Sequence, residues 1–142
     1  MRIETSTLEI ETSADTDVLD LSSHVEGFLR ESGIDEGALL VFVPGSTAGV
    51  TTIEFESGAL EDLRRALEGL APCDAEYAHD LRWGDGNGYA HVRAALLGPS
   101  LCIPVREGRA VLGTWQQIVL CDFDNRPRRR RILLQAMGNG RA

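Results

Sequence analysis

The sequence contains no lysine, and all 14 of its basic residues are arginine. It has 22 acidic residues, so the formal net charge at pH 7 is −8. Such a surface repels nucleic-acid phosphates and anionic lipid headgroups, and binding to nucleic acid or to a membrane is therefore not expected. An acidic, lysine-free surface also stays hydrated in concentrated salt, which suggests a halophilic source.

Long apolar runs are absent too. No segment approaches the roughly 20 apolar residues that a membrane-spanning helix needs. The first residues, MRIETSTLEIET, alternate polar and apolar side chains and contain no apolar core of a signal peptide. These absences predict a cytoplasmic protein.

Cysteine is scarce, with only Cys73, Cys102 and Cys121. The number is odd, the spacing is wide and no CxxC pair occurs, so neither a disulfide framework nor a paired-cysteine zinc site is predicted. We expect reduced, partly buried thiols, with Cys102 and Cys121 in strands.

The chain is long enough for a hydrophobic core of its own. It has 142 residues, of which 43% are hydrophobic, and it shows no internal repeat or linker. Length and composition together predict one domain over residues 1–142.

In the first part of the chain, hydrophobic periodicity predicts one helix among strands. Apolar residues at helical spacing indicate a helix over residues 16–31, capped by Asp15 or Thr16 and ended by Gly33. Alternation or continuous apolar character predicts strands over residues 2–11, 38–44 and 50–55.

The second part of the chain has two further helical patterns and then only strands. A helix over residues 58–70 is expected to be capped by Ser57, with Leu60, Leu63, Leu67 and Leu70 on its apolar face. The other expected elements are a polar loop over 71–87, a helix over 89–97 ended by Gly98-Pro99, and strands over 100–106, 109–121 and 129–137. This order predicts an α+β sandwich, with two to three helices on one side of a mostly antiparallel sheet.

Two of the three histidines are candidates for chemistry. His79 precedes a glycine-rich stretch in the long loop, and His91 lies among small residues on the predicted third helix. A hydrogen-bonded core histidine is the commoner outcome for His91, and a metal ligand or base at a pocket wall is the alternative. The spacing of His79 and His91 matches no standard metal motif. His24 lies beside an apolar helix face and is given no role.

Other polar residues could line a pocket. Glu54 lies on a predicted strand face, which is either solvated or turned towards a pocket. The turn Gly45–Gly49 offers backbone N–H groups and the hydroxyls of Ser46 and Thr47 to an anion, although it lacks the lysine of a P-loop. The arginine-rich segment 126–131 is either a solvated strand entry or a source of phosphate-binding guanidinium groups.

A more specific pattern lies in SLCIPVREGRAVLGTWQQI. Its fixed positions resemble the signature of the YjbQ family, also described as the secondary thiamine-phosphate synthase family. They are Ser100, Ile103, Val105, Gly108, Gly113-Thr114-Trp115-Gln116 and Ile118. The resemblance extends to AGVTTIEFE, to His79-Asp80, to HVRAALLGPSLCIP and to the C-terminal DFDNRPRRRRILLQAMG, so that it covers nearly the whole chain.

The resemblance implies an α+β sandwich that assembles as a homotrimer, with a polar pocket near subunit contacts. It implies catalytic roles for Glu54, His79 and His91, with both histidines as candidate ligands of a divalent metal, Zn²⁺ or Mg²⁺. The candidate ligand-binding residues are Ser46, Thr47, Asp80, Asn87, Arg93, Trp115 and Gln116. An alternative makes Gly113-Thr114-Trp115-Gln116 a structural element.

The chain departs from the family pattern at three positions. Gly45 and Tyr89 stand where family members usually or often carry histidine, and Ile53 stands in place of an asparagine. Two functions therefore remain open. One is a small-molecule transferase with thiamine-phosphate synthase activity, and the other is a non-catalytic trimer that binds a metal or a small phosphorylated molecule.

Overall fold

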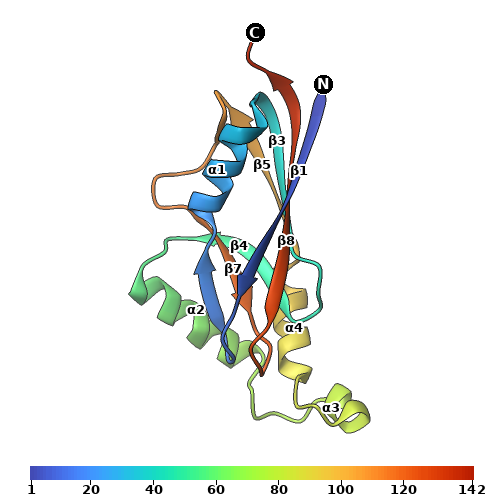
Figure 1. The fold of residues 1–142 in the computed structure, drawn as a ribbon. Coiled ribbons are helices and arrows are strands. Elements are labelled where there is room, and N and C mark those ends of the chain that lie inside the picture. The colour runs from blue at the N-terminus through green and yellow to red at the C-terminus, as the bar shows by residue number, and fades with distance from the viewer.

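Two antiparallel sheets and four helices make up the computed structural model, which describes residues 1–142 (Figure 1). One sheet has five strands in the order β1-β8-β3-β5-β6, and the other has three in the order β2-β7-β4. The elements are β1 (Arg2–Glu11), β2 (Asp17–Asp20), α1 (Ser22–Ser32), β3 (Ile34–Phe42), β4 (Ala48–Ile53), α2 (Ser57–Leu70), α3 (Ala78–Trp83), α4 (Gly88–Leu97), β5 (Ser100–Arg106), β6 (Arg109–Ala110), β7 (Gln117–Asp122) and β8 (Arg129–Gly140).

The three-stranded sheet separates two hydrophobic cores. Along β7, Ile118 and Leu120 belong to the larger core with α1, whereas Val119 and Cys121 belong to a smaller core under α2 and α4. All four side chains are fully buried. Alternating strand residues point to opposite faces, so a continuous apolar run is what a sheet covered on both faces requires.

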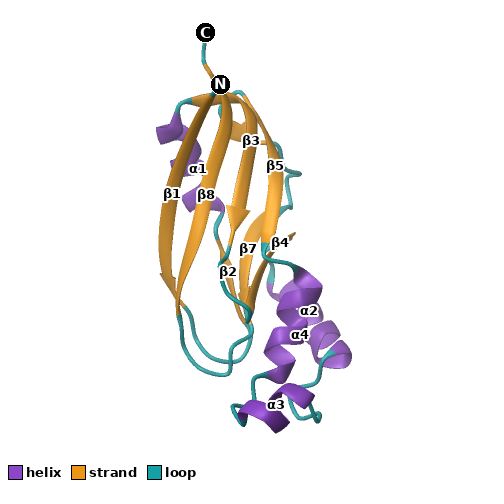
Figure 2. Cartoon of the chain, turned by 90° about the vertical axis from the view of Figure 1, so that its right-hand side faces the viewer, coloured by secondary structure: helices purple, strands orange, loops and turns teal.

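The helices divide between the two ends of the molecule. α1 covers the five-stranded sheet near the chain termini, while α2, α3 and α4 gather at the far end (Figure 2). No helix is both long and apolar enough to cross a bilayer. The predicted α+β sandwich with mostly antiparallel sheets is confirmed, and so are the strands predicted over 2–11 and 129–137 and the helix over 89–97.

The helix predicted over residues 16–31 is wrong at its start. Asp15 and Thr16 adopt left-handed φ values of 64° and 59°, so neither begins a helix, and residues 17–20 form β2. β2 pairs with β7, which places Val18 opposite Cys121 in the smaller core. Strand pairing here overrides the helical spacing of the apolar residues, and only Gly33 ends the helix as expected, with φ 67°.

Three further predictions fail around loops. The strand predicted over 109–121 is interrupted, because residues 111–116 form a loop between β6 and β7. The loop predicted over 71–87 contains the short helix α3, and β4 ends at Ile53, before the predicted residue 55. Isolated apolar residues next to Gly113 and around Gly84 carry too little periodicity to mark these boundaries.

Several local assignments also change. Glu56 caps α2 in place of Ser57, because its carboxylate accepts hydrogen bonds from the backbone N–H groups of residues 58 and 59, and these bonds lower its pKa. Leu70, predicted on the apolar face, is exposed. Cys73 and Cys102 are exposed rather than partly buried, whereas Cys121 is buried, and all three thiols are free.

Candidate functional site

Two histidines that lie far apart in the predicted elements meet where α3 and α4 pack together. His79 is near the start of α3 and His91 is on the first turns of α4. Their ring centroids are 4.3 Å apart and their planes are inclined by 43°. Each side chain is partly buried. The structure therefore brings together the pair that the sequence analysis singled out.

Two carboxylates lie beside the first of these rings. His79 Nδ1 is 3.3 Å from Asp85 Oδ1 and 3.5 Å from Asp80 Oδ1. This nitrogen is buried but makes no hydrogen bond, because neither carboxylate is aligned with it. One ligand atom from each of the three residues fits within 4.8 Å of the others. An imidazole nitrogen with two carboxylate oxygens is a donor set for a divalent cation.

The same carboxylates fix the turn between α3 and α4. Asp80 Oδ1 accepts a hydrogen bond of 2.8 Å from the backbone N–H of Gly88, and Asp85 Oδ1 accepts one of 3.1 Å from Asn87. Only glycine fits at residue 88, because a Cβ there would lie 2.4 Å from the Cβ of Tyr77. This close approach of the backbones sets the distance between the histidines.

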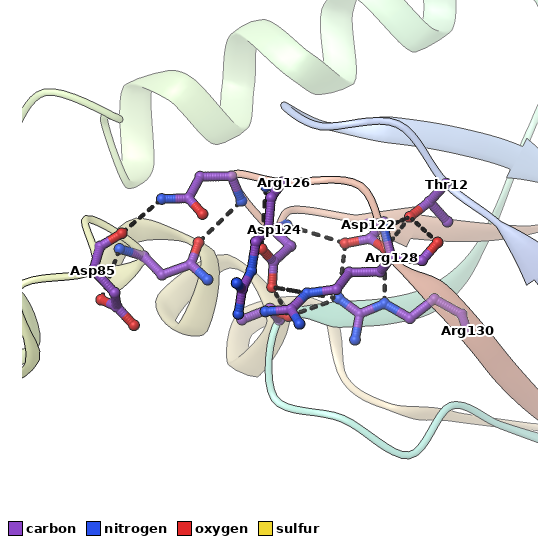
Figure 3. A network of polar contacts seen from close by, with 10 residues as sticks. Thr12, Asp85, Asp122, Asp124, Arg126, Arg128 and Arg130 are labelled. Carbon is purple, nitrogen blue, oxygen red and sulfur yellow. Dashed lines mark hydrogen bonds and ion pairs between the residues drawn. The ribbon is translucent and has the colours of Figure 1, made fainter.

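The facing wall is a buried network of arginine and aspartate (Figure 3). The guanidinium group of Arg130 forms two hydrogen bonds to Asp122, from Nε at 2.7 Å and from Nη2 at 2.8 Å. The Asp122 side chain is fully buried, and that of Arg130 is 10% exposed. Thr12 donates a further hydrogen bond of 2.7 Å to Asp122. A buried charge needs such partners, because isolated burial is very costly.

Asp124 extends this network towards the helices. Burial alone raises the pKa of its carboxyl group, but hydrogen bonds from Thr47, Arg128, Asn87 and the Arg126 backbone outweigh burial and lower the pKa. The Thr47 hydroxyl donates at 2.9 Å, and Arg128 Nε lies 2.9 Å away. Asp124 therefore stays ionised and joins the turn after β3 to the end of β7.

These two walls enclose a pocket of about 610 Å³. Trp83 is its one hydrophobic residue. The other lining residues are Gly45, Ser46, Thr47, His79, Asp85, Asn87, His91, Asp124, Arg128 and Arg130. The imidazole and carboxylate side suits a cation, while the guanidinium and hydroxyl side suits an anion such as phosphate.

Many of the predicted site residues meet in this pocket. Ser46, Thr47, His79, Asn87 and His91 line it, and Asp80 lies directly behind His79. The first turn of α3 brings the Asp80 carboxylate to 3.5 Å from His79 Nδ1, without a hydrogen bond between them.

Four predicted residues lie elsewhere. Glu54 is exposed beyond the end of β4, and Trp115 is 72% exposed in the loop before β7. Gln116 makes hydrogen bonds to Gly113 and to Thr52, outside the pocket. The motif around Trp115 is thus not at the edge of the pocket within one chain.

Arg93 has a structural position. It is 2% exposed, and its guanidinium group donates to Glu68, to the backbone oxygen of Ala71 and to Thr16. All three guanidinium nitrogens of Arg93 therefore donate to acceptors within the protein. It does not line the pocket, and no anion reaches it there.

The residues at two family histidine positions supply no imidazole. Tyr89 is 4% exposed, packs in the smaller core, and places its hydroxyl 3.4 Å from Asp15. Gly45 lies on the pocket wall with a φ of 145°. Ile53, at the asparagine position, packs against the smaller core.

Sequence reasoning missed five residues of the pocket as individuals: Trp83, Asp85, Asp124, Arg128 and Arg130. Asp85 lies within the glycine-rich WGDGNG that was noted only as loop. Asp124 follows a buried apolar strand, where a charged residue needs a partner, and Arg130 is the buried member of a segment judged only as a group. The buried position of one arginine among five depends on the strand register.

Comparison with known proteins agrees with this fold. The profile described as "UPF0047 protein YjbQ-like" matches residues 6–139. The chain belongs to this family. A UPF0047 protein of Methanothermobacter thermautotrophicus is 41% identical over 97% of this chain and 94% of that protein. The UPF0047 protein YugU of Bacillus subtilis is 37% identical over 93% of this chain and 98% of that protein.

Solved structures of this family share the architecture. A hypothetical protein from Aeropyrum pernix K1 has a TM-score of 0.89 at 34% identity, covering 96% of this chain and 99% of that one. A YbjQ-like protein of unknown function from Sulfolobus solfataricus P2 has a TM-score of 0.87 at 32% identity, covering 97% and 100%. The family is one of unknown function, so an activity must be argued from the pocket.

Proposed function

We propose that the pocket binds a small phosphorylated molecule together with a divalent cation, and that it catalyses a transfer in which a phosphorylated group leaves. One observation carries the proposal: His79, with two carboxylates within 3.5 Å of its Nδ1, shares a pocket with Arg128 and Arg130. A cation site opposite guanidinium groups is the arrangement that a departing phosphorylated group requires.

His79, Asp80 and Asp85 would hold the cation. The buried, unpaired Nδ1 of His79 supports this fit, and the nitrogen donor favours Zn²⁺ over Mg²⁺, which prefers oxygen ligands. A cation bound there would neutralise charge on the leaving group. His91, whose ring centroid lies 4.3 Å from that of His79, is placed to hold or transfer a proton, and Arg128 and Arg130 orient phosphate oxygens.

We propose the reaction of thiamine-phosphate synthase. The motif around Trp115 resembles the signature of the secondary thiamine-phosphate synthase family. The ring nitrogen of a thiazole phosphate forms a C–N bond to the methylene carbon of a pyrimidine methyl diphosphate. The C–O bond to diphosphate breaks, and its electron pair leaves with the diphosphate. No oxidant or reductant is needed.

A metal titration and a turnover assay test this function. We expect calorimetry to show one Zn²⁺ per chain, with at least tenfold weaker binding in His79→Ala and in Asp85→Asn. His24→Ala is the matched control, because this exposed histidine of α1 lies outside the pocket. Thiamine phosphate should form from the two substrates with the wild type and not with His79→Ala. Unchanged metal binding in both pocket variants would refute the cation site.

A non-catalytic binding role is the second candidate, and one observation favours it. Asp122 and Asp124 neutralise the charges of Arg130 and Arg128, and neither residue 45 nor residue 89 adds an imidazole. This arrangement holds a ligand but supplies few groups for acid–base chemistry. Binding of both metal and phosphate without turnover of any phosphorylated substrate would support this role.

We also propose that the protein assembles as a homotrimer. Large apolar side chains stay exposed in two separate regions of the molecule: Trp115 and Val111 in one loop, and Leu81 and Trp83 on α3. Such side chains commonly mark contact surfaces. Light scattering coupled to gel filtration should give three times the chain mass of 15.5 kDa. A mass of one chain at micromolar concentration would contradict the trimer.

A further inference from the structure

We infer that the phosphate group of the ligand binds at Arg130 Nη1 and the adjoining turn Gly45–Thr47. This inference rests on the proposed function and deepens it, because it assigns the anion to one wall of the pocket and to named donors. It also gives Asp122 the role of a positioning residue, which acts on the ligand only through Arg130.

The guanidinium group of Arg130 is fixed by hydrogen bonds on one edge only. Its Nε and Nη2 are fixed by Asp122, and Nη2 also donates at 2.6 Å to the hydroxyl of Thr47. Nη1 donates to no acceptor in the protein, although the side chain is only 10% exposed. An arginine that is nine-tenths buried and held on one edge presents a rigid, unsatisfied donor.

This donor lies next to Gly45. Nη1 lies 3.0 Å from the point that a Cβ of residue 45 would occupy, and both residues line the pocket. Gly45 has no side chain and adopts a φ of 145°, a conformation that glycine tolerates. The missing side chain therefore leaves the space in front of Nη1 open to a ligand from the pocket.

Other hydrogen-bond donors belong to the residues around the space in front of Arg130 Nη1. The backbone N–H groups of Gly45, Ser46 and Thr47 donate to no backbone acceptor, and the Ser46 side chain is exposed on the same turn. Arg128 lies on the same wall, with its side chain 35% exposed. Several converging N–H and O–H donors suit the oxygens of a phosphate group.

This subsite is separate from the cation side of the pocket. Asp80 and Asp85 lie beside His79, so the acidic groups that repel an anion are on the α3 side. The two buried aspartates of the opposite wall are already paired with guanidinium groups. A phosphorylated molecule is thus oriented with its phosphate towards β8 and its cation contact towards α3.

Calorimetric titration of inorganic phosphate tests the assignment. The key variant is Arg130→Lys, and its matched control is Arg131→Lys, which alters the neighbouring residue that is 72% exposed and paired with Glu9. We expect at least tenfold weaker phosphate binding in Arg130→Lys and less than twofold change in Arg131→Lys. Thermal melting reports whether each variant is folded.

A second pair of variants avoids the buried network. Ser46→Asp places a carboxylate on the exposed turn beside Nη1, and Ser23→Asp adds the same charge on α1. We expect Ser46→Asp to weaken phosphate binding at least tenfold and Ser23→Asp to leave it within twofold. This pair keeps the test decisive if Arg130→Lys does not fold.

The outcomes separate this inference from the proposed function. Wild-type phosphate affinity in Ser46→Asp and in folded Arg130→Lys would overturn the subsite, while Zn²⁺ binding that depends on Asp85 would keep the cation site. Zn²⁺ binding without any phosphate binding would also overturn the subsite. Phosphate binding that depends on Arg130, without Zn²⁺ binding, would support the subsite and refute the cation site.

Discussion

Two of the molecule's cavities differ in size and in the chemistry of their lining residues. A cavity of about 760 Å³ lies between α1 and the loop of residues 111–116, next to the Gly113-Thr114-Trp115-Gln116 motif. The pocket between α3, α4 and the start of β8 is about 610 Å³. The larger cavity has no histidine, and its charged residues lie at exposed positions such as Arg141, whereas the smaller one contains two histidines and buried ion pairs.

This difference places the sequence signature and the candidate site in separate regions of the molecule. Gln116 uses its side chain to hold its own loop, through Gly113 and Thr52. In the smaller pocket, side chains from four separate segments converge, and their charges are matched by partners from other segments. Convergence of titratable groups is the better guide to chemistry.

The largest expected effect contrasts a buried ion pair of the pocket with an exposed one of the larger cavity. Asp122→Ala leaves Arg130 buried without its carboxylate, and we expect a loss of about 3–5 kcal/mol in unfolding free energy. Asp35→Ala removes the partly buried partner of the exposed Arg141, 3.3 Å away, and should cost about 0–1 kcal/mol.

Urea denaturation of both variants measures this difference. If Asp122→Ala does not accumulate, Thr12→Val removes the hydrogen bonds of the Thr12 hydroxyl to Asp122 and to the Arg128 backbone N–H, and should cost about 1–3 kcal/mol. Equal stability losses for Asp122→Ala and Asp35→Ala would show that the network is not a structural base of the pocket.

The next prediction concerns whether the loop around Trp115 and the pocket act independently of each other. Trp115 is 72% exposed, and in the proposed trimer its side chain is expected to be covered. Trp115→Ala should weaken association by about 2 kcal/mol or more, as buried aromatic contacts at interfaces often do. Analytical ultracentrifugation measures the association, and Zn²⁺ affinity should stay within twofold. A large loss of Zn²⁺ affinity would mean that a neighbouring chain completes the pocket.

Much of the fold was predictable from local patterns. Approximate alternation identified β1, and the glycine at the end of α1 was found because a left-handed C-terminal residue has a strong sequence signal. The two main errors have different causes, because β2 is decided by its pairing with β7, whereas the apolar residues next to Gly113 carry too little periodicity to mark the 111–116 loop. Val18 fits a helix by spacing but is held in a strand opposite Cys121.

The site was predictable by residue type but not by geometry. His79 and His91 stood out because histidine is rare in this chain, but their ring contact requires the packing of α3 against α4, where Gly88 closely approaches Tyr77. Arg93 was chosen as a phosphate ligand because it is charged, but it is buried with Glu68. Sequence alone does not show which arginine is paired internally and which faces a pocket.

At high pH we expect a weaker effect, a loss of stability that arises in the smaller hydrophobic core behind the pocket. Burial raises the pKa of Tyr89 to about 12 and that of Cys121 to about 12. Both folded-state pKa values exceed the unfolded ones. The buried, protonated Tyr89 and Cys121 side chains therefore make their full contribution to the free energy of unfolding below the unfolded pKa. This contribution is lost as pH rises towards 12. Urea midpoints should fall between pH 9 and 12, and Tyr89→Phe should flatten the part above pH 10. An unchanged slope in Tyr89→Phe would exclude Tyr89 as a cause.

The smallest expected effect lies at low pH, on the opposite side of the same pocket. Burial of Asp124 raises its pKa, but hydrogen bonds from Thr47 and Arg128 outweigh burial, so the folded-state pKa is below the ordinary value. A lowered folded-state pKa gives stability that is present above the unfolded pKa of 3.8 and is lost as pH falls through the folded value. Urea midpoints should therefore decline below about pH 4, and Asp124→Asn should reduce this decline relative to wild type. Asp35→Asn, at the larger cavity, is the matched control and should leave the acid slope unchanged. If Asp35→Asn flattened the slope as much as Asp124→Asn, acid sensitivity would not belong to the pocket, and the electrostatic difference between the two cavities would be refuted.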